Sequence, residues 1–501
     1  MVRKCISLFV SIIVISVNLH GESAITSIIS PETQGCLACH RSVTPGIVGD
    51  WETSRHSRIT PLQALKKTQF ERRISADTLP DSLANHVVGC AECHRLNPKS
   101  HKDTFTHSNR EVHIVVTPED CAVCHPSENG QYAQNKMAHA RSNLLDNPLY
   151  KDFIVAANGT QRFQDEKLSI QTPDSITNAQ SCLFCHGTEV KVTGTSARQT
   201  IFGEMNFPVL SGWPNQGTGR LNPDQSIGSC TPCHARHSFS IEMARKPYTC
   251  GECHKGPDVL AYKVYTASKM GNIYSSMKSE FNFEAVPWKV GKDFTAPTCA
   301  VCHVSLLTDS NGNVIARRSH QMNDRLYVRL FGLPYAHPQP RSPRTSKIRN
   351  AAGLSLPTNL DGTPVSVALI GQKEQIARRQ NMMSICKGCH STQWTEHHFN
   401  ALDEVIDNTN ERTLEATAIL EATWQRGIET GPLNGGSIFD EPMEKEWIWG
   451  WFFNANSIRL AAAMAGADYG VFDNGRWQMS KNIRDLHNMY RQELMLQRLD
   501  N

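Results

Sequence analysis

The pentapeptide CLACH at residues 36–40 decides how this chain of 501 residues folds. Its pattern, two cysteines three positions apart with a histidine directly after the second, recurs seven more times. The eight copies are CLACH (36–40), CAECH (90–94), CAVCH (121–125), CLFCH (182–186), CTPCH (230–234), CGECH (250–254), CAVCH (299–303) and CKGCH (386–390). Of the 17 cysteines only Cys5 lies outside these copies, so no pair of thiols remains for a disulfide.

The spacing of this motif suits the attachment of a c-type haem. Cysteines at i and i+3 of one helical turn point the same way and each bond to one haem vinyl group, while the histidine binds the iron from the proximal side. This composition would produce about 0.02 such pentapeptides by chance. Zinc ribbons need no histidine after each cysteine pair, and thioredoxin-like redox sites occur singly. We therefore predict eight covalent c-type haems, each with its iron.

The predicted attachment residues are Cys36, Cys39, Cys90, Cys93, Cys121, Cys124, Cys182, Cys185, Cys230, Cys233, Cys250, Cys253, Cys299, Cys302, Cys386 and Cys389. The predicted proximal iron ligands are His40, His94, His125, His186, His234, His254, His303 and His390.

Eight haems leave roughly 60 residues per haem, fewer than an ordinary domain has. We therefore expect a mainly α multihaem cytochrome c, with short helices and loops around the haems and a long-helix C-terminal region. The expected division is a signal peptide over 1–21, a multihaem domain over 22–365 with haems one to seven, and a region over 366–501 with haem eight and helices for oligomerisation. Asp440-Glu441-Pro442 signals a helix start, and helical spacing recurs from Met479 to Leu494.

The N-terminus predicts export and the charge balance predicts the kind of partner. Arg3 and Lys4 precede an apolar run over 6–17, the pattern of a signal peptide, so we expect a periplasmic or equivalent location. The net charge of +3 gives no reason to expect nucleic acid. Without Arg3 and Lys4 it falls to +1, and eight oxidised haems at about −1 each bring it near −7. An acidic protein suits a small basic electron carrier, such as a small cytochrome c, as its redox partner.

The remaining histidines decide whether any iron is open. An iron with protein ligands on both faces transfers electrons, whereas a vacant face can bind a small molecule. Of 21 histidines, 12 remain once the eight proximal ones and His20 are set aside, enough to close every iron or leave one open. The predicted distal ligands are His56, His113, His139, His237 and His320. His86, His101 and His107 stay open, and His397 and His398 are expected on a solvated helix face.

His237 follows His234 by three residues, so both side chains project from one helical face. They cannot bind opposite sides of the same iron. His237 is therefore expected to ligate a neighbouring haem.

The runs GWPNQGTGRLNPDQSIGSCTPCHARHSFS (212–240) and PYTCGECHKGPD (247–258), with the number and order of the CxxCH copies, resemble the octahaem hydroxylamine oxidoreductase family. This family includes hydroxylamine and hydrazine oxidisers and nitrite-reducing relatives, and the resemblance extends from Cys36 to the C-terminal helices. It implies that the haem at Cys182, Cys185 and His186 is catalytic, that the others form an electron-transfer array, and that three subunits form a homotrimer.

The same resemblance implies further site residues and two departures. In oxidising members a tyrosine from a neighbouring subunit bonds to the catalytic haem, and AMAGADYGVF places Tyr469 in that region. Asp258 is a candidate proton relay, but Val259 follows it where the family commonly has histidine. Met270 stands where the family usually has a histidine ligand, so a thioether ligand is expected there.

The leading hypothesis is an exported oxidoreductase that oxidises hydroxylamine or hydrazine at one open haem, with electrons leaving through the others to a soluble or membrane-associated redox partner. One alternative is a nitrite or hydroxylamine reductase of the same family. A second alternative is a non-catalytic electron-transfer protein in which every iron is closed. The sequence leaves the direction of the reaction open.

Overall fold

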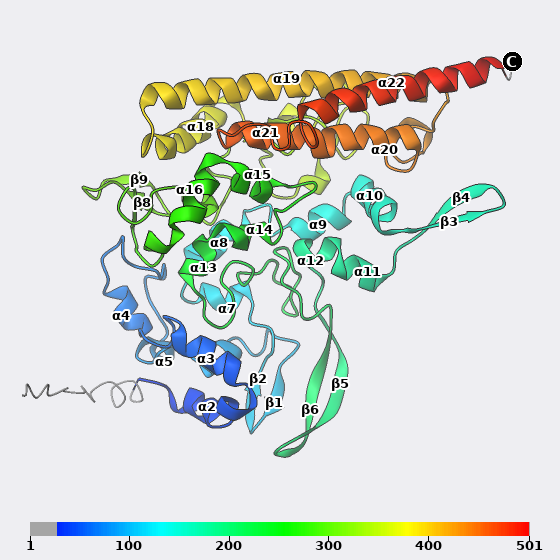
Figure 1. The fold of residues 1–501 in the computed structure, drawn as a ribbon. Helices are drawn as coiled ribbons and strands as arrows, with labels where there is room; N and C mark the ends of the chain where they lie inside the picture. The colour runs from blue at the N-terminus through cyan, green and yellow to red at the C-terminus, as the bar shows by residue number, and fades with distance from the viewer. Residues whose placement is uncertain (1–27, 500–501) are drawn as a thin grey trace, which may run out of the picture.

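The computed structural model describes residues 28–499 and divides into two parts (Figure 1). A layer of long helices from the C-terminal third of the chain lies over a body of short helices and loops. The predicted signal peptide lies outside the described residues. About 46% of the structure is helical, above the roughly 30–35% of an average soluble protein, so the mainly α expectation is confirmed.

The body consists of helices that are each too short to be stable alone. They are α2 (Pro31–Val43), α3 (Pro45–Thr53), α4 (Pro61–Leu65), α5 (Asp81–Ala84), α6 (Cys90–His94), α7 (Pro118–Ala122), α8 (Pro126–Ala133), α9 (Ala140–Leu145), α10 (Pro148–Asn158), α11 (Ser175–Gln180), α12 (Cys182–His186), α13 (Ile241–Arg245), α14 (Pro247–Gly251), α15 (Ala261–Ala267), α16 (Lys269–Met277) and α17 (Cys299–His303). Short 3-10 turns are η1 (Lys278–Glu280), η2 (Thr345–Lys347), η3 (Ser366–Ala368) and η4 (Pro432–Asn434).

Local sequence explains where these helices begin. Seven of them start with proline, whose fixed φ suits the first helical position and whose missing N–H is not needed there. Three of them, α6, α12 and α17, coincide with a CxxCH copy. Isolated helices under about 12 residues are marginal in water, so these turns need partners that hold them in place.

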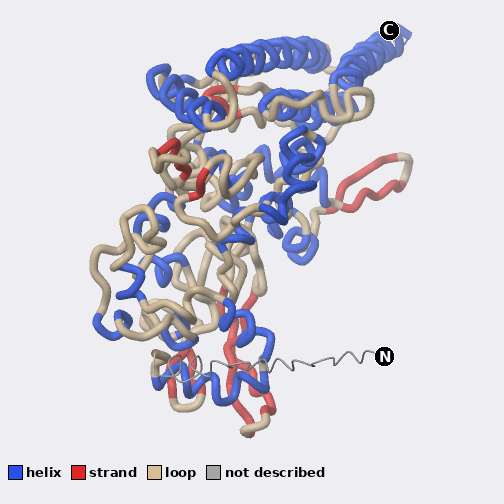
Figure 2. The backbone as a smooth tube through the Cα atoms, turned by 60° about the vertical axis from the view of Figure 1, so that its left-hand side comes forward, coloured by secondary structure: helices blue, strands red, loops and turns tan. Residues whose placement is uncertain are grey.

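Strands occur only as small sheets in the described part of the chain (Figure 2). They are β1 (Phe105–His107), β2 (Arg110–Val112), β3 (Thr160–Gln164), β4 (Lys167–Gln171), β5 (Lys191–Thr200), β6 (Gly203–Ser211), β7 (Trp288–Lys289), β8 (Leu307–Thr308), β9 (Val314–Ala316), β10 (Val328–Arg329) and β11 (His337–Pro338). Only β7–β8–β9 has three strands, and the other sheets are antiparallel pairs. The hairpins β3–β4 and β5–β6 project from the body (Figure 1).

The upper layer contains the long helices α18 (Gln372–Lys387), α19 (Thr392–Gln425) and α22 (Arg476–Leu499) and the shorter helices α20 (Pro442–Ile448) and α21 (Asn456–Ala463). The last CxxCH copy, 386–390, begins in the final turn of α18 and continues into the connection to α19. Helix α20 begins at Pro442, as the sequence predicts, and continues through the π-helical turn η5 (Trp449–Ala455) into α21. No helix within residues 28–499 has the length and apolar character needed to cross a membrane.

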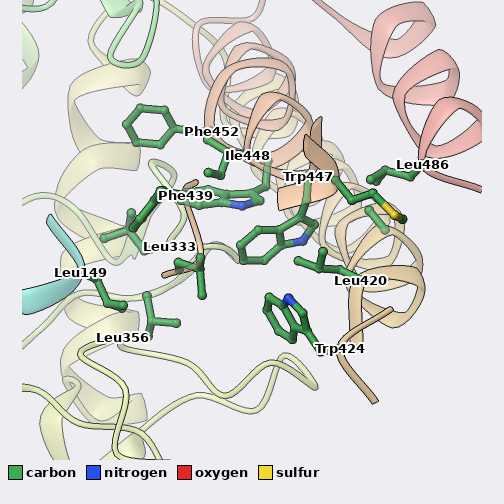
Figure 3. Packing of buried hydrophobic residues seen from close by; sticks show 14 residues of the cluster. Leu149, Leu333, Leu356, Leu420, Trp424, Phe439, Trp447, Ile448, Phe452 and Leu486 are labelled. Carbon is green, nitrogen blue, oxygen red and sulfur yellow. The ribbon is translucent and has the colours of Figure 1, made fainter. Parts of the chain in front are cut away.

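Aromatic packing holds this layer together (Figure 3). Trp447 and Leu486 are fully buried in a cluster contributed by α19, α20, η5 and α22. The indole of Trp447 donates a hydrogen bond to Thr417 Oγ1 at 2.9 Å, which satisfies its only polar group. Met479 and Leu486 are both buried from the predicted helical stripe of α22, so that spacing is confirmed.

A buried carboxylate lies beside this cluster. Glu444 is fully buried, and its side chain accepts hydrogen bonds from Trp424 Nε1 at 3.1 Å and from the Asp440 and Glu441 N–H groups at 3.2 Å. Burial, only partly opposed by these donors, raises the pKa of Glu444 to about 8. The carboxyl group therefore carries a proton at neutral pH.

This raised pKa predicts a pH dependence of stability that Glu444→Gln removes. The folded state binds the Glu444 proton more tightly than the unfolded chain, so its contribution is complete below pH 4.5 and is lost as pH rises through about 8. The loss is limited to a few kcal/mol, since one pKa unit corresponds to about 1.4 kcal/mol. Between pH 6 and pH 9 the thermal midpoint should fall less in Glu444→Gln than in the wild type. Glu415→Gln, on the exposed face of α19, should behave as the wild type. Equal falls in all three proteins would contradict the assignment.

Candidate haem sites and active site

All eight CxxCH copies border one continuous cavity of about 2400 Å³. Every motif histidine and every motif cysteine except Cys39 lies on its wall. Protein interiors pack about as densely as organic crystals, so side chains do not leave a space of this size without a group to fill it. The donors on the wall are those that covalent haem requires, and the residues present therefore fit a haem array.

Contacts between cysteines show which motifs are neighbours. Thiols from different motifs lie close enough to shift one another's pKa in four places: Cys36 with Cys90, Cys121 with Cys230, Cys185 with Cys253, and Cys250 with Cys299. Weaker interactions of the same kind join Cys93 to Cys124, Cys233 to Cys250 and Cys302 to Cys386. The sites therefore form a connected series in which the fourth motif adjoins the sixth.

Pairs of histidine rings face one another across the cavity. Their ring centres are 6.2 Å apart for His40–His107, 6.4 Å for His56–His125, 6.0 Å for His94–His113, 6.5 Å for His94–His237 and 6.4 Å for His234–His320. A metal–imidazole bond is about 2 Å long, so two axial rings on one iron have centres about 6 Å apart. These separations therefore support a distal role for His56 and His320. The iron bound to His94 has one distal position, so of His113 and His237 only one can occupy it.

The protonation of these rings suits iron binding. Burial lowers the pKa of His56, His234 and His320 to about 4, so the imidazoles are neutral at physiological pH, the form that binds metals. His94 Nδ1 donates to the His113 carbonyl at 2.8 Å, which leaves Nε2 free for the iron. His237 lies near His94 and not opposite its own His234, as the sequence predicts.

Two histidines whose role the sequence leaves open, His107 and His101, have different surroundings in the structure. His107 faces His40 and borders the cavity, in the position of a distal ligand. His101 stacks on His113 with ring centres 3.6 Å apart and lies between Asp103 and Asp120. Burial alone would lower its pKa, but the ion pair with Asp103 and the hydrogen bond to Asp120 outweigh burial and raise the pKa of His101 to about 9. His101 is therefore a charged structural residue.

His139 differs from the other predicted distal ligands. Its Nε2 donates to the Ala133 carbonyl at 2.9 Å, and its side chain is not on the cavity wall. The ligand role of His139 stays a prediction that the geometry does not support. His398, expected on a solvated face, instead borders the cavity beside Trp394, which stacks between His398 and His390.

His337 is a residue that the sequence reasoning missed. It is 2% exposed, its Nδ1 donates to the Pro338 carbonyl at 2.7 Å, and its Nε2 has no hydrogen-bond partner. A single histidine in the stretch LPYAHPQP (333–340) carries no motif. Only its burial in the folded structure marks His337 as a candidate functional residue.

The fourth motif is held in place by its surroundings. Helix α12 ends at Gly187, whose φ of +97° would strain any side chain, and an added Cβ would lie 2.3 Å from the Arg220 nitrogen. His186 Nδ1 donates to the Ala140 carbonyl at 3.1 Å, so its Nε2 is available for iron. Asn215 Nδ2 donates to the Leu183 carbonyl at 3.1 Å and fixes the motif from the other side.

No second histidine ring faces His186 within residues 28–499 at the separations seen for the five pairs. Asp258 borders the same cavity and interacts electrostatically with Cys185 and His254. The structure thus brings the predicted pair His186 and Asp258 into one region, at the junction of the fourth and sixth motifs.

Tyr469 and Met270 occupy other surroundings. Tyr469 is half-buried and packs with Leu260 and Val264 of its own chain, away from the cavity wall. Met270 borders the cavity and packs in an apolar cluster that includes Cys302. No second histidine ring faces His254, His303 or His390 at an axial separation in the described residues, so a thioether ligand from Met270 stays a prediction.

Comparisons with known proteins agree with this geometry. A family model described as "Seven times multi-haem cytochrome CxxCH" matches residues 219–325. A solved structure titled "Hypothetical multiheme protein" is 40% identical, with a TM-score of 0.87 over 97% of this chain and 100% of that chain. The chain belongs to the multihaem c-type cytochromes.

Two further relatives place this cytochrome near hydroxylamine oxidoreductases. The reducing HAO-like protein complex of Kuenenia stuttgartiensis has a TM-score of 0.62 at 18% identity, over 95% of this chain and 87% of that one. A probable nitrite reductase-hydroxylamine oxidoreductase fusion protein of the same organism is 23% identical over 420 residues, or 79% of this chain. The cytochrome spans 38% of that relative's length. The predicted resemblance to the hydroxylamine oxidoreductase family is confirmed.

The histidine pairing can be tested by removing one distal ring. His320→Ala should open the iron bound to His234, because no other side chain would replace the lost imidazole at that separation. Carbon monoxide added to the reduced cytochrome should then bind one more haem than in the wild type, seen as an added absorption change. His139→Ala is the matched control and should bind no additional carbon monoxide. The pairing is wrong if His320→Ala binds no additional carbon monoxide while His139→Ala does.

Proposed function

We propose that this cytochrome carries eight haems and converts a small inorganic nitrogen compound at the haem attached to Cys182 and Cys185. The observation that carries the proposal is the combination found at the fourth motif. His186, like His254, His303 and His390, has no facing histidine ring among the described residues, and Asp258 on the same cavity wall interacts with Cys185 of this motif. The names of the two Kuenenia relatives, which refer to hydroxylamine oxidoreductase and nitrite reductase, support this substrate class.

The chain's own residues supply orientation and proton handling. A haem iron with one free face binds a nitrogen atom and exchanges electrons with it. The Ala140 carbonyl fixes the tautomer and direction of His186. Asp258 is the carboxylate that holds or moves a proton at this end of the cavity, because each electron step on a small nitrogen compound is accompanied by proton transfer. A haem held by Cys250, Cys253 and His254 of the adjoining sixth motif would be placed to exchange electrons with a haem at the fourth motif.

The direction of the reaction depends on Tyr469. Oxidation of hydroxylamine or hydrazine, the leading hypothesis from the sequence, rests on a covalent bond between Tyr469 of a neighbouring subunit and the catalytic haem. Here Val259 replaces the family's usual histidine beside Asp258. This replacement favours the second candidate, reduction of nitrite or hydroxylamine.

The mass of the haem peptide containing Cys182 and Cys185 decides between the two directions. After proteolysis it should be free of the Tyr469 peptide if the protein is a reductase, and joined to it if the protein is an oxidiser. Carbon monoxide binding by the reduced wild type tests the open iron itself. A spectrum unchanged by carbon monoxide would mean that every iron is closed, and the cytochrome would then be an electron-transfer protein.

Asp258→Asn should lower turnover of the preferred substrate at least tenfold, since general acid–base groups commonly contribute about 100-fold or more. The carbon monoxide difference spectrum should be retained, because the iron and His186 are untouched. Asp361→Asn, in an exposed turn remote from the cavity wall, is the control. Full activity in Asp258→Asn would remove Asp258 from the mechanism.

We further propose that the mature cytochrome is exported and works as a homotrimer with a small redox partner. Large apolar side chains are exposed on the projecting parts: Phe163 and Leu168 of hairpin β3–β4, Ile201 and Phe202 at the tip of β5–β6, and Leu496 and Leu499 of α22. Phe163 is 75% exposed and Phe202 is 65% exposed. Exposed apolar groups gathered on projecting elements suit contacts with further copies of the chain.

Native mass measurement tests the assembly. The wild type should have three times the mass of one haem-loaded chain. Phe163→Ser combined with Leu168→Ser should shift the population toward smaller species, because it removes apolar contact area from the hairpin. Val367→Ser changes a side chain that is more exposed, at 85%, but lies in the turn η3, and should leave the mass unchanged. A wild-type protein that is monomeric at micromolar concentration would refute the trimer.

A further inference from the structure

Three basic side chains meet beside the haem cavity. Lys136 and Arg329 lie on its wall. Strand β10 pairs with β11 so that Arg329 lies opposite His337. Lys136 Nζ donates to Gln339 Oε1, and Gln339 Nε2 donates to the Val328 carbonyl at 2.8 Å. The short β10–β11 pair therefore gathers these three groups at one place.

No carboxylate neutralises this group. The salt bridges found within residues 28–499 include neither Lys136 nor Arg329. The charged neighbours of Lys136 are Arg329 and Arg378, and those of His337 are Arg329, Lys136 and Arg459. Burial and then these cations hold the pKa of Lys136 well below its usual range. Arg378 differs, because Glu374 pairs with it.

Unpaired buried cations are strongly unfavourable, because little water is present to solvate them and they repel one another. Lys136 and Arg329 are nevertheless only half-buried by surface area, since part of each side chain borders the cavity. His337 adds a buried Nε2 with no hydrogen-bond partner. Lys136 and Arg329 therefore present two basic side chains without a carboxylate partner to the cavity, and His337 lies opposite Arg329 in the strand pair.

We propose that Lys136, Arg329 and His337 form a binding site for a small planar anion, a carboxylate or a similar oxyanion. The arginine fork presents two parallel N–H groups to two oxygens of such an anion, and the lysine adds a point charge. The anion has two possible sources, a propionate of an attached haem or a free ion such as nitrite. The first source rests on the haem array proposed above, whereas the second does not.

Haem-loaded protein with Lys136→Met tests the site. Methionine keeps the approximate length of lysine and removes the charge. Lys136→Arg keeps the charge, and Lys373→Met removes an exposed charge from α18. Two quantities are measured for each protein: the reduction potentials of the haems in a spectroelectrochemical titration, and the thermal midpoint during titration with sodium nitrite or sodium formate.

If a haem propionate occupies the site, Lys136→Met should lower the potential of at least one haem component without added anion, because a lost positive charge favours the oxidised form. If a free anion occupies it, nitrite and formate should raise the wild-type midpoint with saturation, and Lys136→Met should lose this response. In either case Lys136→Arg and Lys373→Met should resemble the wild type.

Two results would overturn the proposal. The first is that Lys136→Met and Lys373→Met have the same haem reduction potentials and the same thermal midpoints during anion titration. The other result concerns assembly. If Lys136→Met fails to retain its haems, the proposal requires that Lys136→Arg retains them. Equal loss of haem in both variants would show that the shape of the lysine and not its charge is required. Turnover assays are not needed for either result, so failure here leaves the proposed reaction at the fourth motif untouched.

Discussion

Covalent attachment of each haem to a five-residue segment is the constraint on which this fold depends. Helices as short as α6, α12 and α17 do not persist on their own in water. Side chains line the cavity that these helices border but do not fill it. The attached groups therefore complete the interior that the chain leaves open. The loops between motifs have one main task, which is to bring each segment and its facing imidazole to the correct separation. This explains why the body has so little regular structure while its motif histidines are so closely ordered.

The C-terminal layer follows a different principle. Its helices pack by conventional burial of aromatic and aliphatic side chains around Trp447, and its boundary signals are those of ordinary soluble helices. It meets the body where α18 contacts β9, where α21 contacts α15, and where Leu149 of α10 enters the cluster around Trp447. The body has smaller apolar clusters of its own, around Trp288 and around Trp51, and otherwise surrounds the cavity that the motifs border.

Much of this could be predicted from the sequence, because covalent attachment requires a fixed local pattern. The attachment cysteines, the motif histidines, the start of α20 and the buried stripe of α22 all follow from spacing within a few residues. The pairing of the facing histidine rings does not follow from spacing, since His107 and His56 reach their partners through loops whose path no local sequence pattern specifies. His101 was left open because Asp103 and Asp120 enclose it only after folding. His139 resembled a ligand in sequence, yet a nearby carbonyl already uses its Nε2. His337 had no signal in the sequence.

The sixth motif has more neighbours than its place in the chain suggests. Its cysteines lie beside those of the fourth, fifth and seventh motifs. The sixth motif is therefore a branch point of the series, and the fourth motif, whose His186 has no facing histidine ring, lies on a side branch. Haems attached at these motifs would form a branched array, in which electrons held on two arms could reach the third in quick succession.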